Sequence, residues 1–349
     1  VTITGGEIAI GLSATTESIK YAYTCPAPLE AYTCYITTGG GDSVVRNSGD
    51  IKIDIGIETP YDNSYGVGIR ARTGKYGGNA IVENTGTINV NVSDGNAIGL
   101  LAISSGLYSN GDALVSNSGD VSVYATTSVT GIGIYSNNAA AIYNTGDVTS
   151  ITSGIGPVTR ALGLYATASY EVEIINSGDI AVSGGVGAVG IASVGYLAGA
   201  RVVNTGDVMV DSGYYYTYYN PYYGYTEYNG GWAYGMTAVS VGLGVASVVN
   251  SGDIVATGVT RGTGISAQSS FGSTAIYNAG DVTASGQEVF AYGIASYARS
   301  REEFWYGEIG YSIIFNSGDL NVSSGALAVG IQADQSMGNI EIYNTGDIS

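Results

Sequence analysis

Hydrophobic and polar residues alternate along this chain in a motif that recurs from one end to the other. The motif reads Asn, then Ser, Thr or Ala, then Gly, then Asp or Thr, with an apolar residue two positions before the Asn and another four positions after it. Because successive side chains of a strand point to opposite faces, this spacing predicts strands with one buried face. The Asn residues of the motif are Asn47, Asn84, Asn117, Asn144, Asn176, Asn204, Asn250, Asn278, Asn316 and Asn344.

A second motif, small-x-Gly-[Ile/Leu/Met]-x-[Ala/Ser], alternates with the first, for example at 97–102 and 188–193. Neighbouring Asn residues are most often about 28 positions apart, so each unit supplies roughly three short strands. A unit of this size cannot bury its apolar face alone, whereas stacked units share one continuous core. We therefore predict an all-β fold, a right-handed parallel β-helix (β-solenoid) of about ten coils. At a strand spacing of about 4.8 Å its length is about 48 Å.

One solenoid is predicted to span residues 1–349, because the repeat runs through the whole chain. Three loop insertions interrupt it: 15–42, which holds both cysteines, the Tyr-rich 211–232, and the charged and aromatic 297–311. Glycine makes up 55 of 349 residues, and no stretch has an apolar period of 3.6 residues. Both features argue against a helical repeat.

The repeated Asn has the same strand parity as the apolar residue before it. We therefore expect it to point inward at a corner and to hydrogen-bond to its copies above and below, as Asn ladders do in stacked strands. The Gly two positions later, for example Gly178, is expected to supply the positive φ of a sharp corner.

Nine of the ten motifs continue with Asp, and Thr87 is the exception. Stacking aligns these carboxylates in a column, which either binds Ca²⁺ weakly or closes turns on its own backbone amides. The specific Ca²⁺ loop signatures are absent from the sequence, so we favour the turn and expect no metal and no cofactor.

The charge balance excludes several functions. The chain has 29 acidic and 11 basic residues, no His and a net charge of −18. Nucleic acid is not expected as a partner, since phosphate binding needs clustered Lys and Arg. No apolar run is long enough for a membrane span. Without His, a Ser-His-Asp or Cys-His site is impossible, and no pair of carboxylates is marked for glycoside cleavage, so we predict that the protein is not an enzyme.

Cys25 and Cys34, the two cysteines, lie in the first insertion, and we predict a disulfide between them, with free thiols as the alternative. Together with the few lysines and the Gly-, Ser-, Thr- and Tyr-rich composition, this predicts an extracellular or cell-surface location. Asn91 and Asn321 begin Asn-x-Ser sequons at outward strand positions and are candidate glycosylation sites.

The Tyr-rich insertion is the most unusual local feature. It interrupts one coil, so it must project from the side of the rod, and tyrosine provides a large, rigid contact area with a polar tip. We predict contact with a glycan, a surface or a neighbouring fibre, and the alternative is a loop folded back on its own solenoid. The candidate contact residues are Tyr214, Tyr215, Tyr216, Tyr218, Tyr219, Tyr222, Tyr223, Tyr225 and Tyr228.

The two alternating motifs resemble the repeats of secreted bacterial β-helix adhesins, including autotransporter passenger and haemagglutinin-like proteins. The resemblance covers nearly the whole chain except the Cys-bearing and Tyr-rich insertions. It implies export, a rod-shaped passenger and contact with surfaces or other cells. The sequence lacks the membrane barrel, secretion domain and polar capping segments of that family, although solenoids need caps over their end strands.

The last residues of the chain continue the repeat into its first residues. Read from end to start, the sequence gives Asn-Thr-Gly-Asp-Ile-Ser followed by Val-Thr-Ile-Thr-Gly-Gly, which places Val1 at an inward position six after Asn344. We therefore predict a structural subunit of an extracellular filament, in which copies stack head to tail by strand addition, or an equivalent repeat within one longer chain. The alternative is a segment of a long adhesin that binds glycans or surfaces through the Tyr-rich insertion. The predicted assembly interface comprises Val1, Ile3, Ile8, Ile10, Leu12, Ile342, Asn344, Ile348 and Ser349.

Overall fold

The computed structural model describes residues 1–4, 8–16, 35–36, 41–56, 64–74, 77–105, 111–154, 159–213, 215–220, 225–299, 310–336 and 338–349. These residues form three long parallel sheets and one separate hairpin. No helix occurs among them, and therefore none with the length and hydropathy of a bilayer span.

Each sheet takes one strand from every coil, and sheet 2 also contains the additional strand β3. Sheet 1 contains β1 (Thr2–Thr4), β5 (Ile51–Ile55), β8 (Ile88–Val92), β11 (Val121–Ala125), β14 (Val148–Thr152), β17 (Ile180–Ser183), β20 (Val208–Ser212), β25 (Ile254–Gly258), β28 (Val282–Gly286) and β31 (Leu320–Ser324). Sheet 2 contains β3 (Tyr35–Ile36), β2 (Ile8–Thr16), β6 (Ser64–Thr73), β9 (Gly95–Ser104), β12 (Ser128–Ser136), β15 (Arg160–Ala168), β18 (Gly187–Gly195), β23 (Trp232–Ser240), β26 (Arg261–Ser269), β29 (Phe290–Ala298) and β32 (Leu327–Gln335). Sheet 3 contains β4 (Ser43–Asn47), β7 (Ala80–Asn84), β10 (Ala113–Asn117), β13 (Ala140–Asn144), β16 (Val172–Asn176), β19 (Ala200–Asn204), β24 (Ala246–Asn250), β27 (Thr274–Asn278), β30 (Gly310–Asn316) and β33 (Gly338–Asn344).

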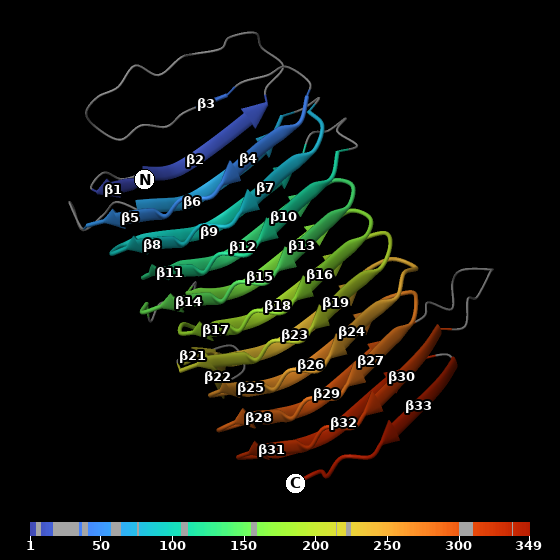
Figure 1. Ribbon diagram of the computed structural model, residues 1–349. Coiled ribbons are helices and arrows are strands. Elements are labelled where there is room, and N and C mark those ends of the chain that lie inside the picture. The colour runs from blue at the N-terminus through green and yellow to red at the C-terminus, as the bar shows by residue number, and fades with distance from the viewer. Residues whose placement is uncertain are drawn as a thin grey trace.

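The chain passes through sheets 1, 2 and 3 in turn and so makes one coil of a right-handed parallel β-helix, which confirms the predicted fold (Figure 1). Coil 1 consists of β1, β2 and β4, and coil 10 consists of β31, β32 and β33. The strands of successive coils lie side by side from the N-terminal to the C-terminal end of the rod.

In sheets 1 and 3 the predicted alternation of buried and exposed residues holds. In β5, Ile51, Ile53 and Ile55 are buried while Lys52 is exposed, and the register places Ile51 directly above Ile88 of the next coil. Equivalent apolar side chains therefore stack on one another along the axis and fill a single core between the three sheets.

In sheet 2 the predicted strict alternation is wrong at the glycine that recurs in the second motif. In β6, the register pairs Val67 and Ile69 with both neighbouring strands but passes over Gly68. A Cβ atom on Gly68 would lie 2.5 Å from Cγ2 of Ile88 in the core and 2.5 Å from the carbonyl oxygen of Gly99. Ile69 also packs in the core, so two successive residues face inward and the strand bends there.

The bend also gives sheet 2 apolar contacts on its outer face. Ile10, Val67 and Leu101 are buried in a cluster that is separate from the core, on the two sides of the bend. The outer face of sheet 2 is therefore partly apolar, although strand parity alone predicts that outward positions meet solvent.

At the N-terminal end, part of the edge of sheet 2 is already paired. The two-residue strand β3 runs parallel to β2 and pairs Tyr35 with Ser13 and Ile36 with Ala14. β3, which comes from the first insertion, therefore occupies this stretch of the edge strand.

Candidate functional site

The motif Asn residues form a continuous ladder along the rod. Asn144 Nδ2, for example, donates one hydrogen bond to Oδ1 of Asn176 at 2.7 Å and another to the carbonyl oxygen of Gly146 at 2.6 Å. The same side-chain bond links each Asn to the next from Asn47 to Asn344. The Asn side chains between the two end coils are buried, so these bonds satisfy groups that water does not reach.

The ladder has a direction. Each Nδ2 points toward the following coil and each Oδ1 toward the preceding one. Within the described residues, Asn344 at the C-terminal end donates only to the carbonyl oxygen of Gly346, while Oδ1 of Asn47 accepts only the amide of Gly49, at 3.4 Å. The rod thus has an open donor at one end of the ladder and an open acceptor at the other.

The corner glycines stack closely, and the expected positive φ is wrong. Gly178 and its equivalents are not among the glycines with positive φ. Instead, a Cβ atom on Gly178 would lie 2.1 Å from the carbonyl oxygen of Gly146 in the preceding coil. The motif needs glycine because the backbones of successive corners approach each other, and Gly49, the first of the column, has nothing within 4 Å of this position.

The Asp column also bonds between coils. The backbone amide of Asp179 donates to Oδ1 of Asp147 at 2.9 Å, and that of Asp207 donates to Oδ1 of Asp179 at 2.9 Å. Each carboxylate of the column up to Asp319 therefore accepts an amide of the next coil, and the prediction that it closes its own turn is wrong. No group of three or more His, Cys, Asp or Glu side chains suited to a metal ion occurs in the described part of the chain, and the Ca²⁺ alternative stays a prediction.

The apolar core is open at the C-terminal end. Ile342 and Ile348 of the last turn are 45% and 52% exposed, whereas Ile314 and Leu320, which occupy the same positions one coil earlier, are 0% and 1% exposed. Coil 1 differs, since Ile3 and Val45 are each only 8% exposed. The C-terminal end therefore presents unpaired strand edges together with exposed core side chains.

An aromatic row follows the outer face of sheet 3 to the same end. The rings of Tyr277 and Phe315 stack at 5.3 Å with an interplanar angle of 8°, and those of Phe315 and Tyr343 stack at 4.6 Å and 6°. Tyr343 is the last ring of the row and is half exposed. The equivalent position in coil 1 is Arg46, whose pKa is raised by its hydrogen bond to Glu83.

The start of the chain lies in a different register from the predicted one. Thr2 and Ile3 of β1 pair with Lys52 and Ile53, so Val1 corresponds to Ile51, four positions after a motif Asn. Ile348 is also four positions after its Asn and bridges to Leu320. The predicted position of Val1, six after Asn344, is therefore wrong, because Val1 and Ile348 are equivalent positions.

The predicted assembly residues do not all belong to the core. Ile3 and Leu12 pack into it, but Ile8 is 66% exposed and Ile10 lies in the outer cluster. Both face outward because they lie before the bend of β2, where Ala9 is the residue that enters the core. The prediction that Ile8 and Ile10 belong to the core is therefore wrong. Val1 is exposed, and its ammonium group donates to the carbonyl oxygen of Asp50 at 2.7 Å.

The remaining predicted residues are placed as follows. Cys25, Cys34, Tyr214, Tyr222 and Tyr223 lie outside the described residues. The backbone of the other candidate tyrosines belongs to an antiparallel hairpin of β21 (Tyr215–Asn220) and β22 (Tyr225–Gly230), which is outside the three sheets. The sequon residues Asn91 and Asn321 are exposed on the outer face of sheet 1.

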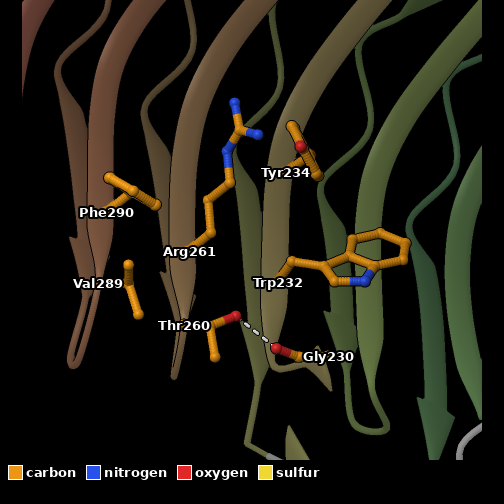
Figure 2. Close-up of a pocket in the computed structure, with 7 residues that line it drawn as sticks. All are labelled: Gly230, Trp232, Tyr234, Thr260, Arg261, Val289 and Phe290. Atoms are coloured by element: carbon orange, nitrogen blue, oxygen red, sulfur yellow. Dashed lines mark hydrogen bonds between the residues drawn. The ribbon is translucent and has the colours of Figure 1, made fainter. Parts of the chain in front are cut away.

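A groove that the sequence analysis missed crosses the outer face of sheet 2 beside this hairpin (Figure 2). Its volume is about 510 Å³, and its lining residues are Gly230, Trp232, Tyr234, Thr260, Arg261, Val289 and Phe290. Trp232, Arg261 and Phe290 lie next to one another on the adjacent strands β23, β26 and β29. They are paired in the register because each directly precedes the first, inward-facing small residue of the second motif in its coil. An alignment of the repeats on this small residue predicts that the three side chains are neighbours on the outer face of sheet 2.

Comparison of the chain with known protein families, with curated proteins and with solved structures finds no match. The resemblance to secreted β-helix adhesins therefore rests on the two sequence motifs. Of what it implies, the structure shows the parallel β-solenoid.

Proposed function

We propose that this protein is a non-catalytic structural unit of an extracellular filament, in which coil 1 of one copy continues the three sheets of the copy before it. The observation that carries this proposal is the open C-terminal end, where core side chains and strand edges are exposed together. Exposed strand edges template the addition of further strands, and burial of apolar area contributes about 25 cal/mol per Å².

The polar groups at the two ends are complementary. In such a joint, Nδ2 of Asn344 would donate to Oδ1 of Asn47 in the next copy, which extends the ladder by one bond. The amide of Asp50 would in the same way reach the carboxylate of Asp347. Tyr343 would meet Arg46 of the next copy, and a guanidinium over a tyrosine ring contributes about 0.5–1 kcal/mol at an exposed site. These contacts fix the axial and rotational register of the joint.

Two segments must move for the joint to form. Since Val1 and Ile348 are equivalent positions, the first residues of one copy and the last residues of the other compete for the same place beside β31. In addition, β3 occupies part of the edge of β2 on which β32 of the preceding copy would stack. Tandem copies within one longer chain would use the same contacts.

The substitution Gly49→Ala tests the joint with little effect on the unit itself. Its new Cβ atom meets nothing within 4 Å in one copy, but in a joint it would meet the carbonyl oxygen of Gly346, as Gly86 shows with a separation of 2.2 Å from the oxygen of Gly49. We expect wild-type filaments in electron micrographs and separate rods of the variant with unchanged thermal unfolding.

Gly56→Ala is the matched control, because its Cβ atom also meets nothing within 4 Å and it lies away from the corner column. Filaments of the Gly49→Ala protein that match the wild type would refute in-register stacking. The denatured mass of native filaments distinguishes the two forms of the joint: a species of 35.6 kDa indicates non-covalent stacking, and a much larger chain indicates tandem repeats.

A second candidate function is adhesion through the Tyr-rich hairpin, and it is favoured by the position of that hairpin outside the three sheets. Deletion of residues 214–228 is expected to abolish adhesion to surfaces and to leave filaments intact. Loss of filaments on this deletion would contradict a purely axial assembly.

A further inference from the structure

We propose that the groove beside the hairpin binds an acidic oligosaccharide, with the carboxylate of a uronic acid on Arg261 and sugar rings against Trp232 and Phe290. This inference is independent of filament formation, because the groove lies on the side of the rod and can be tested on separate rods.

The first observation is an arginine whose side chain is held in place without an acidic partner among the described residues. Cζ of Arg261 lies 5.1 Å from the ring centroid of Tyr234 in the preceding coil and 5.1 Å from that of Tyr292 in the following coil. Its Nε donates to Oγ1 of Thr263 at 3.2 Å. No ion pair of Arg261 occurs within the described residues, and Glu288 in the adjoining turn does not pair with it.

This arrangement suits a carboxylate ligand. A guanidinium presents several N–H donors in one plane, and with Nε already bonded the terminal nitrogens are the ones that remain for two parallel bonds to a carboxylate. The two tyrosine rings fix the side chain before a ligand arrives, which reduces the conformational entropy lost on binding. Glu288 and the other acidic residues that the structure describes leave this guanidinium without an ion pair, so its charge is available to a ligand in the groove.

The second observation is the pair of aromatic side chains on either side of Arg261. Figure 2 shows Trp232 on one side of the arginine and Phe290 on the other, on adjacent strands of sheet 2. The position of the Trp232 side chain is set by the glycine beneath it. Its six-membered ring lies over Gly187, where a Cβ atom on that residue would be only 2.2 Å from Cζ2 of Trp232. Phe290 is 41% exposed, so its ring offers apolar surface to a ligand.

The shape favours a chain-like ligand. Trp232, Arg261 and Phe290 follow one another along the rod axis, one per coil, and all three line the groove. Rigid aromatic faces provide contact area for the apolar faces of sugar rings, and the polar groups between them determine orientation. The hydrogen bond from Thr260 to the carbonyl oxygen of Gly230 ties the floor of the groove to the base of the hairpin.

The test measures binding of an oligogalacturonate by calorimetry, with a neutral oligogalactan of equal length as the comparison probe. We expect the wild type to bind the acidic probe and to bind the neutral one at least tenfold more weakly, since about 1.4 kcal/mol corresponds to a tenfold change. Arg261→Gln should remove this preference, and Trp232→Ala should weaken binding of the acidic probe by a similar factor.

Arg160→Gln is the matched control, because Arg160 occupies the same outward position in β15, with Ser128 and Gly187 as its register neighbours, and does not line the groove. Thermal unfolding of each variant establishes that it is folded. The proposal is overturned if the wild type does not bind the acidic probe, if both probes bind equally, or if Arg160→Gln weakens binding as much as Arg261→Gln. Self-association of rods that is lost in Arg261→Gln, without saccharide binding, would also overturn it and assign the groove to contacts between rods.

Discussion

At the residue scale, the repeated Asn, Asp and corner Gly residues each contact the equivalent residue of the neighbouring coil. Asn176 bonds to the Asn before and the Asn after it, and the carboxylate of Asp147 receives the amide of Asp179. These are contacts between residues about one repeat apart in sequence. Within an interior motif the Asn side chain bonds only to the carbonyl oxygen two positions later, as Asn176 does to Gly178, and the remaining side-chain contacts of the motif need a stacked neighbour.

Asn176→Ala is predicted to destabilise the solenoid strongly. The substitution removes the acceptor of Nδ2 of Asn144 and the donor to Oδ1 of Asn204, both in a buried ladder. A buried polar group without a partner costs about 1–3 kcal/mol, so we expect a loss of several kcal/mol in urea unfolding. Asn344→Ala is the control, since its side chain is exposed at the end of the ladder, and an equal loss in both variants would contradict the ladder as the source of stability.

At the scale of the strand, the sequence predicts sheets 1 and 3 well and sheet 2 less well. In β5 every second residue is a large apolar one, so the alternation identifies its buried face directly. In β6 the inward position next to Ile69 is Gly68, which has no side chain and gives no hydrophobic signal. The bend exists because Ile88 fills the space of the missing side chain, and that contact links two different coils.

The prediction of the candidate sites from the sequence was limited in the same way, because the sequence does not show which residues of different coils are in contact. The open donor of Asn344 and the exposed Ile342 could be predicted, because they continue a visible pattern. The register of Val1 could not be fixed by the junction alone, since Val1 and Ile3 are both apolar and differ by two positions, which preserves the inward face. The groove around Arg261 was missed because its residues occupy outward positions that the core pattern ignores.

At the scale of the whole molecule, the two ends of the rod differ in how they are closed. In a solenoid each coil contacts only its neighbours, so stability is approximately a sum of coil and interface contributions, and an end coil lacks one interface. At the C-terminal end this deficit leaves Ile340 and Ile342 of β33 and Ile348 about half exposed, whereas Ile3 and Val45 of coil 1 are buried. Assembly through the C-terminal end would also bring together copies of net charge −18, which repel one another at low ionic strength.

Amide hydrogen exchange should therefore distinguish the two ends and report on assembly. In separate rods of the Gly49→Ala protein we expect β33 to exchange fastest among the strands of sheet 3, since it has a neighbour only on the side of β30 and its core residue Ile342 is exposed. The central strand β16 should be the slowest, because it is paired on both sides. In wild-type filaments, β33 should become as slow as β16, since it gains a neighbour and its core side chains are covered. Fast exchange of β33 in filaments would mean that copies associate through the sides of the rods and leave the C-terminal coil open.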